Sequence, residues 1–480
     1  MDTSSAKLKM RFVECVRHFT PSWFAAITGT GAVGLLWHNF PYAEGSTPIL
    51  VFTYIFFFLN LFLFLLFNVV TAIRYFMFPR IWLSMIHHPT QSLFLATYPM
   101  SVSTLVNVAV GLLYEQGGFG GNGFLYTLWA LWWFDVFLSA LSAYGIVHLM
   151  FTRQKHTLES ITAGWILPIL PLLTCSGTGA ILAAPLLALS PSKSLTTLVV
   201  ATVSAAMGLT LAFTILTLYL LHLVLHGPPR GPGVVSVYIP LGPLGQGGYS
   251  ILLLGAGYDA VLPLPGPGGS GSASATATVL QWEGVGQVIR VLALAAALAL
   301  WAAGTMWLLY GLLATGDVLW HDHVHFKQAF WSLLFPNGVY ANLSIQLYRT
   351  TDAPFFRVYG AAYGAATLAL WLAVFARTCM LVYSGAMFRA PCIDDVDIHA
   401  AALERDAKKK HAPCVLSAME GAEANGEGLD GVGEETDLGL ELGLGPGMEE
   451  VRIQFLDARR RERRGGGGMA SAGSSRLTVV

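Results

Sequence analysis

The sequence predicts an all-α integral membrane protein with ten transmembrane helices, arranged as five helical hairpins around a central pore. Its 480 residues are 54% hydrophobic and only 11% charged, whereas soluble domains carry roughly 25% charged residues. Ten apolar stretches are long enough to cross a hydrocarbon layer of ~30 Å. A membrane β-barrel would need alternating segments of about ten residues, but residues 51–67 are apolar on every side.

The ten stretches define a membrane domain between two polar ends. Residues 20–386 hold 9 acidic and 11 basic side chains, whereas residues 387–480 hold 17 acidic and 12 basic ones. We therefore predict a cytosolic N-terminus at 1–19, a ten-helix transmembrane domain at 20–386 and a disordered cytosolic tail at 387–480. The expected spans are 20–37, 49–73, 93–114, 124–150, 160–189, 194–226, 235–256, 284–316, 326–348 and 354–386.

Basic residues in short loops predict the orientation, because cytosolic loops are enriched in Lys and Arg. The opposite loops hold Lys193, with Arg349 and Arg357 as exceptions near the end of the domain. Both termini are therefore expected in the cytosol. The basic residues on the predicted cytosolic side are Lys7, Lys9, Arg11, Arg17, Arg74, Arg80, Arg153, Lys155 and Arg230.

Prolines occur inside every second span. Proline removes a helix hydrogen bond, and irregular backbone at membrane depth is tolerated where it is buried in protein or lines a cavity. We therefore predict that the odd-numbered spans are broken helices around a central path and the even-numbered spans are regular helices outside them. The alternative is chance, because proline and glycine are common in membrane helices. The prolines that break the odd spans are Pro21, Pro99, Pro168, Pro171, Pro243 and Pro336.

The interiors of the odd spans carry no formal charge, apart from Lys327 at the beginning of the ninth. Selectivity along such a path would come from its width, from hydroxyl groups and from the backbone dipoles of interrupted helices. These features leave the sign of the permeant ion open. The candidate hydroxyls are Thr28, Thr30, Thr97, Ser176 and Thr178.

Five sequence strings together resemble the fungal sulfite efflux pumps. These pumps belong to the tellurite-resistance/dicarboxylate transporter family, with the plant slow-type anion channels and the fungal malate permeases. The resemblance covers roughly residues 15–390 and does not extend into the tail. The strings are FPYAE at 40–44, TYPM at 97–100, LWWFDVF at 131–137, LGPLGQGGYSILLL at 241–254 and FWSLLFPNGVY at 330–340.

The resemblance implies a barrel of five hairpins whose pore is plugged by a phenylalanine of the ninth helix, here Phe335. It implies sulfite efflux across the plasma membrane; the alternative in the same family is a permease for malate or another C4-dicarboxylate, or an anion channel. No enzymatic activity and no cofactor are implied. The expected partners are a small inorganic or carboxylate anion, membrane lipid and further copies of the chain, in a possible trimer, but no nucleic acid.

Two charged residues inside the spans are candidates for coupling. Asp135 lies deep in the fourth span, where a carboxylate costs several kcal/mol unless it is paired or hydrated. It could carry a coupled proton or be a hydrogen-bonded packing residue. Arg290 lies inside the eighth span and Arg377 inside the tenth; each could attract anions or extend its side chain to the headgroups.

Histidines suggest a remote alternative, a membrane-bound redox enzyme. His222 and His226 are four residues apart and share a helix face, as haem or metal ligands would, but they lie at the predicted cytosolic end of the sixth span. The loop at 321–325 carries three histidines and an aspartate without a visible supporting shell. The five cysteines form no CxxC pair or metal-ligand spacing, so we predict neither a disulfide framework nor a metal site.

Overall fold

The computed structural model describes residues 13–263, 281–321, 324–384 and 387. These residues belong to one compact unit, Met1–Ile398, and within them every regular element is a helix. The predicted all-α membrane class is confirmed. The predicted tail, apart from Met387, lies outside the described residues, as do Asp322 and His323 of the histidine-containing loop.

Seven helical segments among the described residues are long and apolar enough to cross a membrane. The three remaining predicted spans contain α2, α10 and α12, which are short or rich in glycine and polar residues. The count of ten crossings therefore stays a prediction. The seven segments are Thr47–Met77, Ser92–Gln116, Gly121–Thr152, Ala163–Leu189, Pro191–His226, Val285–His321 and Pro354–Tyr383.

Each odd-numbered span begins with a 3₁₀ turn and continues as an α-helix. The tighter 3₁₀ geometry is common at helix termini. We call these five the inner spans, and the end at which they begin the 3₁₀ end. They are η1 (Pro21–Trp23) with α2 (Phe24–His38); η2 (Ser92–Ala96) with α5 (Thr97–Ala109) and the π-helical η3 (Val110–Gln116); η6 (Ala163–Ile169) with α8 (Leu170–Leu189); η7 (Gly231–Tyr238) with α10 (Leu241–Val261); and η9 (Gln328–Leu333) with α12 (Leu334–Thr351).

Four of the five even-numbered spans are continuous α-helices, as predicted. The exception is the fourth span of the chain, which the π-helical segment Leu141–Ile146 interrupts although it contains no proline. The prediction that every even span is regular is wrong at this point, since π-segments have no proline signature. The outer spans are α3 (Thr47–Met77), α6 (Gly121–Ala140) with η4 (Leu141–Ile146) and α7 (Val147–Thr152), α9 (Pro191–His226), α11 (Val285–His321) and α13 (Pro354–Tyr383); α4 (Pro79–His87) and η5 (Leu158–Ser160) lie in connections.

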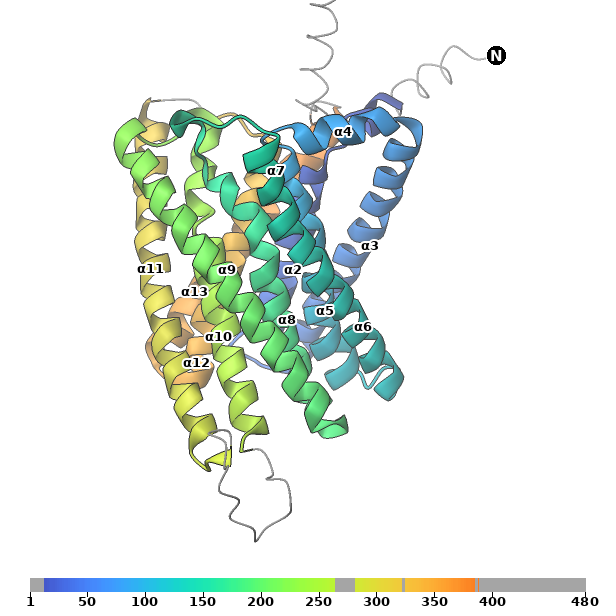
Figure 1. The fold of residues 1–480 in the computed structure, drawn as a ribbon, viewed down its shortest axis with the longest axis vertical. Coiled ribbons are helices and arrows are strands. Elements are labelled where there is room, and N and C mark those ends of the chain that lie inside the picture. Colours follow the sequence, from blue (N-terminus) through green and yellow to red (C-terminus); the bar gives the residue numbers. More distant parts are fainter. Residues whose placement is uncertain (1–12, 264–280, 322–323, 385–386, 388–480) are drawn as a thin grey trace, which may run out of the picture. The chain divides into compact units, whose positions relative to one another are not determined.

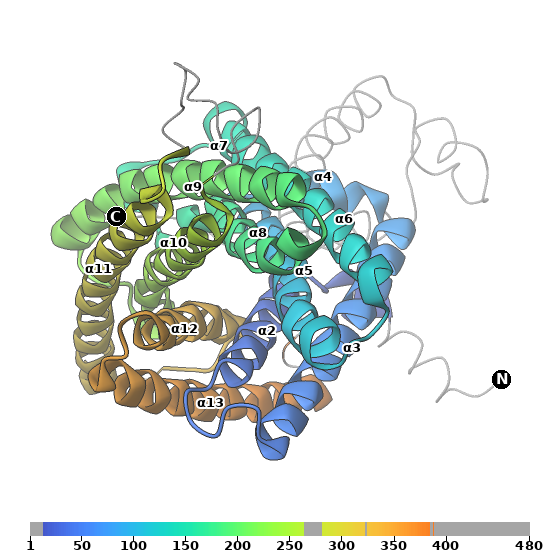
Figure 2. The ribbon, with the colours of Figure 1, turned by 90° about the horizontal axis from the view of Figure 1, so that it is seen from below.

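The inner helices form a closed ring. Contacts run from α2 to α5, α8, α10, α12 and back to α2, and each inner helix also contacts the outer helix that follows it in sequence. Figures 1 and 2 show this arrangement from the side and along the bundle, with α3, α6, α9, α11 and α13 outside. Burial supports this arrangement. In the inner span Ala163–Leu189, 94% of the apolar segment is buried, whereas the corresponding share in the outer spans is 22–33%. The proline pattern therefore separated inner from outer helices correctly.

Glycines allow the inner helices to approach closely. A Cβ atom on Gly245 of α10 would lie 2.8 Å from the backbone nitrogen of Tyr340 in α12. A Cβ atom on Gly31 of α2 would lie 2.5 Å from the side chain of Thr104 in α5. Small residues at such contacts are the usual basis of close helix packing in membranes, so the glycine content of the inner spans reflects the tightness of the ring.

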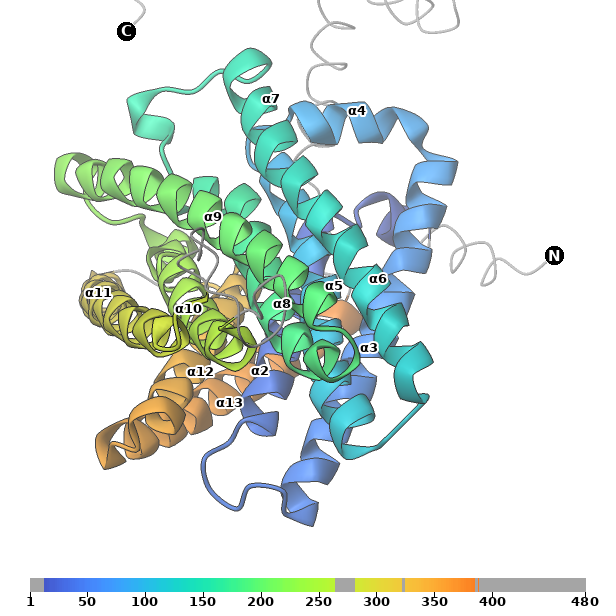
Figure 3. The same cartoon turned by 60° about the horizontal axis from the view of Figure 1, so that its bottom comes forward.

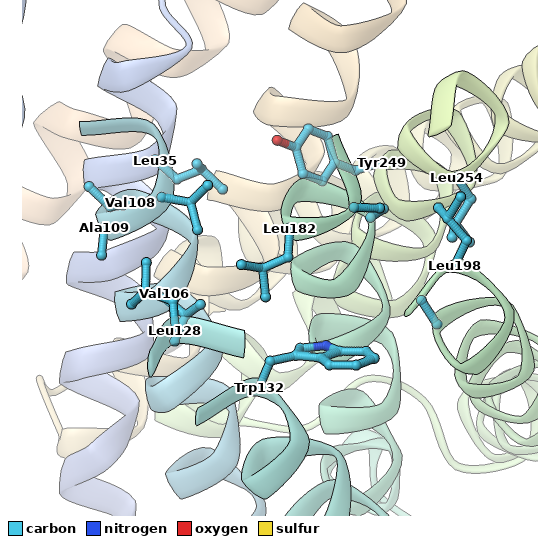
Figure 4. Packing of buried hydrophobic residues seen from close by; sticks show 14 of the residues in the cluster. Leu35, Val106, Val108, Ala109, Leu128, Trp132, Leu182, Leu198, Tyr249 and Leu254 are labelled. Atoms are coloured by element: carbon cyan, nitrogen blue, oxygen red, sulfur yellow. The ribbon is translucent and has the colours of Figure 1, made fainter. Parts of the chain in front are cut away.

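Large apolar side chains fill the space between inner and outer helices. Trp132 of α6 is fully buried, and its indole nitrogen donates a hydrogen bond of 2.8 Å to the backbone oxygen of Cys175 in α8. Leu128 and Leu182 belong to the same cluster, and Figure 4 shows the Trp132 ring beside α8 below Leu182. This packing fixes the outer helix α6 against the ring.

Candidate functional site

One small cavity lies where the 3₁₀ turns of all five inner spans meet their α-helices. Its volume is about 20 Å³, which is room for about one water molecule. Each inner span contributes at least one residue, so the cavity lies at the centre of the ring. The lining residues are Ala25, Thr28, Phe94, Thr97, Met100, Leu167, Leu170, Ile239, Ser332, Phe335 and Pro336.

The predicted prolines lie at these junctions. Pro21 opens η1, Pro168 lies within η6, and the others occupy the second or third position of an α-helix. The first turn of an α-helix has no acceptor for its backbone N–H groups, so proline costs little there. The prolines therefore set where each inner α-helix starts, and only Pro336 of this predicted set lines the cavity itself.

Phe335 lines the cavity from α12 and is 4% exposed. It belongs to one apolar cluster with Met100, Leu167, Leu170 and Ile239. Each of these five residues is the immediate sequence neighbour of a proline. Sequence reasoning identified Phe335 and missed the other four, although their position beside the prolines of the odd spans would have indicated them.

The predicted hydroxyls divide into two groups. Thr28 and Thr97 line the cavity, and each donates its proton to a backbone oxygen, to Ala25 at 3.0 Å and to Phe94 at 2.6 Å. Ser332, which sequence reasoning missed, likewise donates to Ala329 at 2.6 Å. Each of the three lining hydroxyls thus donates its hydrogen bond to a backbone oxygen. None of them has a free O–H group to donate to an anion.

The other hydroxyls do not line the cavity. Thr30 donates to Ala26 and accepts a hydrogen bond of 3.1 Å from the indole nitrogen of Trp371 in the outer helix α13. Thr178 donates to the backbone oxygen of Thr174 at 3.0 Å. The Ser176 hydroxyl is buried without a hydrogen-bond partner among the described residues. These groups contribute to packing between the helices.

No lining residue of the cavity is ionisable. The charge environment is instead set by the backbone, because the first turns of α2, α5, α8 and α12, and Ile239 just before α10, line the cavity. The N-terminus of a helix carries a partial positive charge, worth about 0.3–1 kcal/mol to a nearby anion. The preceding 3₁₀ turns accept hydrogen bonds from N–H groups at these helix starts, such as those of Phe24, Leu170 and Leu334, so the five helix starts favour an anion over a cation only weakly.

Asp135 is fully buried in α6, away from the cavity lining. One carboxylate oxygen accepts a hydrogen bond of 2.5 Å from Ser103 of α5, while the other has no partner among the described residues. The hydroxyls of Ser139 and Ser176 are also buried and have no hydrogen-bond partner among the described residues. The structure thus gives the candidate carboxyl one hydrogen-bond donor, from the neighbouring inner helix α5.

The remaining candidates lie at the two ends of the bundle. Arg290 of α11 forms an ion pair of 3.0 Å with Asp259 of α10 and is half exposed. His222 and His226 stack with ring centroids 4.8 Å apart. Within the described ranges, no group of three or more His, Cys, Asp or Glu residues could hold a metal ion. The described cysteines, Cys15, Cys175 and Cys379, are free.

Three relatives are similar to this chain over most of its length. The sulfite efflux pump of Arthroderma benhamiae is 28% identical over 375 residues, which cover 78% of this chain and 93% of the pump. The malic acid transport protein of Schizosaccharomyces pombe is 24% identical over 363 residues, covering 74% and 77% of the two chains. An uncharacterised transporter of Methanocaldococcus jannaschii is 21% identical over 374 residues, covering 78% and 98%.

The family model described as voltage-dependent anion channel matches residues 18–379. The match includes every inner and outer helix except the last few residues of α13, and it ends before the predicted tail. It agrees with the resemblance carried by the sequence strings and with the ring of five inner helices. The chain therefore belongs to the voltage-dependent anion channel family.

Proposed function

We propose that this protein exports sulfite, or a similar small oxyanion, across the plasma membrane along the axis of the inner ring. The observation that carries the proposal is the cavity that residues of all five inner spans line around Phe335. Family membership makes the chain an anion transporter or channel, and the sulfite pump of Arthroderma benhamiae supports the choice of substrate.

The path selects anions without binding them tightly. Transferring an ion from water into an apolar environment is costly, and the positive helix ends offset part of that cost at the narrowest point. A ring of charged side chains would hold the ion more strongly, but conduction requires that the ion also leave. Backbone dipoles therefore suit rapid passage better than a ring of arginines.

Phe335 closes the path in the state described. Its ring is buried in an apolar cluster, and the space beside it is too small for an oxyanion with its hydration shell. Hydrophobic constrictions of this kind block ions by excluding water. Rotation of the Phe335 side chain away from the axis, next to the helix start at Pro336, would widen the constriction.

The 3₁₀ end is assigned to the cytosol. Arg74, Arg80, Arg153 and Arg230 lie at or beyond the 3₁₀ end of their spans, as expected for cytosolic loops. Residues 1–19 and 387–480 are then cytosolic extensions. A cytosolic anion would meet the Phe335 constriction first and leave at the opposite end, which we call the far end.

We further propose that Asp135 binds a proton during transport. A carboxyl at membrane depth with one serine donor and no basic partner among the described residues is costly as an anion. Export against a gradient needs a group that carries charge, and Asp135 is the one carboxyl of the described residues that is fully buried.

Expression in a sulfite-sensitive yeast tests the substrate. We expect cells carrying the chain to tolerate more sulfite than cells carrying an empty vector, and to release sulfite faster after loading. Uptake of labelled malate in the same cells tests the second candidate, which the malic acid transport protein of Schizosaccharomyces pombe supports. Unchanged sulfite tolerance together with increased malate uptake would replace sulfite by a dicarboxylate.

A further inference from the structure

A guanidinium group is held at the far end of the inner ring, in the last turns of α12. Arg349 donates from Nη1 to the side-chain oxygen of Asn39 at 3.1 Å and from Nη2 to the backbone oxygen of Asn39 at 3.3 Å. The same Nη2 donates to a carboxylate oxygen of Glu44. Asn39 is the residue directly after α2, and Glu44 lies in the loop from α2 to α3. Arg349 of α12 therefore contacts both the end of α2 and the loop that follows it.

Buried polar groups from three inner helices support this guanidinium. The Asn39 amide donates to the Asn342 side-chain oxygen at 3.1 Å and to the Tyr249 hydroxyl at 3.3 Å. Asn39, Asn342 and Tyr249 are 7%, 1% and 4% exposed; Asn39 directly follows α2, and the other two belong to α12 and α10. The far end of the ring therefore carries a fixed, polar, positively charged site, in contrast to the apolar constriction at Phe335.

Glu44 occupies the exposed side of the guanidinium. Its side chain is 65% exposed, whereas that of Arg349 is 31% exposed. The neighbours Ala43 and Gly45 adopt left-handed backbone conformations, with φ of 53° and 70°, and thereby turn the short loop back toward α12. Figure 3 shows this loop between α2 and α3 at the end of the molecule nearest the reader.

A second arginine holds the same loop from α13. Arg357 lies over the Tyr42 ring at 4.3 Å and donates to the backbone oxygen of Pro41 at 3.3 Å. These contacts use its planar face and one nitrogen without neutralising its charge. Two cationic side chains thus hold the loop, and its one exposed carboxylate pairs with Arg349.

We infer that the guanidinium of Arg349, positioned by Asn39, forms a binding site for a small oxyanion at the far end, and that Glu44 is a tethered competitor for it. The Glu44 carboxylate presents a negatively charged oxygen to the guanidinium, as sulfite or a dicarboxylate would. Because exposed ion pairs are weak, a free oxyanion can displace Glu44 from Arg349. When Glu44 binds Arg349 again, it displaces the oxyanion and helps it to leave. The inference rests on the proposed passage of oxyanions along the ring.

Sulfite binding to the purified full-length protein tests the site. The unfolding temperature is measured against sodium sulfite concentration at constant ionic strength, for wild type, Glu44→Gln, Arg349→Gln and the control Arg80→Gln, an exposed arginine at the 3₁₀ end. Removing the competitor should lower the half-saturating concentration about threefold. Removing the guanidinium should raise it about tenfold or more, and the control should match wild type.

Equal half-saturating concentrations for wild type and Glu44→Gln would overturn the inference. This comparison stands even if Arg349→Gln does not fold, because Glu44→Gln retains the hydrogen bonds between Arg349 and Asn39. Sulfite flux through wild type in liposomes separates the two proposals. Absence of flux contradicts the proposed function, whereas flux with unchanged binding in Glu44→Gln contradicts only the site.

Discussion

At the scale of single residues, Asp135 and Phe335 have opposite surroundings. Phe335 is packed among apolar side chains at the cavity, and its proposed role needs only its size and its position beside Pro336. Asp135 lies on an outer helix and accepts a hydrogen bond from Ser103, with its other carboxylate oxygen unpartnered among the described residues. The role proposed for Phe335 is therefore steric, whereas the role proposed for Asp135 depends on its proton.

Replacing Asp135 by asparagine tests the proton. Asparagine keeps the size of the side chain and can still accept a hydrogen bond from Ser103, so packing should be retained. We expect sulfite flux in liposomes to become independent of pH between about pH 6 and about pH 8. Asp317→Asn is the matched control, because that carboxyl is 67% exposed on α11; its flux should keep the pH dependence of wild type. Retained pH dependence in Asp135→Asn would assign the residue to packing.

At the scale of helices, close contact between α10 and α12 closes one side of the ring. Gly245 brings the two backbones together, because any Cβ at this position would meet the Tyr340 backbone. The same α12 carries Phe335 in its first turn, so this contact also positions the constriction. Loss of the glycine should therefore affect both stability and flux.

Gly245→Ala should lower the free energy of unfolding by about 1–3 kcal/mol, because overpacking forces the two helices apart. Gly316→Ala is the control: that glycine is exposed on α11, and no atom lies within 4 Å of the point that an added methyl group would occupy. There alanine should be neutral or stabilising by up to about 1 kcal/mol. Thermal unfolding in detergent measures both variants, and equal unfolding temperatures would contradict the close packing of α10 on α12.

The sequence predicted which helices are inner because proline and glycine are retained where backbone is irregular or close to its neighbour. Pro99 and Pro336 are examples, and both lie at the start of an inner α-helix. It did not predict the π-segment of the fourth span, which has no proline. Nor could it predict that Asn39 and Asn342 are hydrogen-bonded, because that contact joins helices 303 residues apart in sequence.

At the scale of the whole molecule, five parallel inner helices are enclosed by five outer helices that expose apolar side chains. Phe58 and Phe62 of α3 are 55% and 61% exposed, as expected of a surface that contacts lipid or another copy of the chain. A trimer stays a prediction. The parallel inner helices give the molecule a direction, with one end apolar and narrow and the other polar and cationic.

The direction of the molecule in the membrane can be tested at the C-terminus. An epitope tag after Val480 should bind antibody in permeabilised cells and not in intact cells, because the basic loops predict that this end is cytosolic. A tag inserted after Gly45, in the loop between α2 and α3, should show labelling in intact cells. The reverse pattern would place the Phe335 constriction on the outer side.

The most direct test of the central claim is sulfite flux into liposomes containing wild type, Phe335→Ala or Phe330→Ala. Phe330 lies five residues earlier, packs against Phe326 and does not line the cavity. We predict that Phe335→Ala raises the sulfite flux by about tenfold or more, and that it raises the flux of malate and chloride in the same way if wild type conducts them. The flux through Phe330→Ala should match that of wild type. Equal flux through Phe335→Ala and wild type, in preparations of equal unfolding temperature, would contradict a path along the inner ring closed by Phe335.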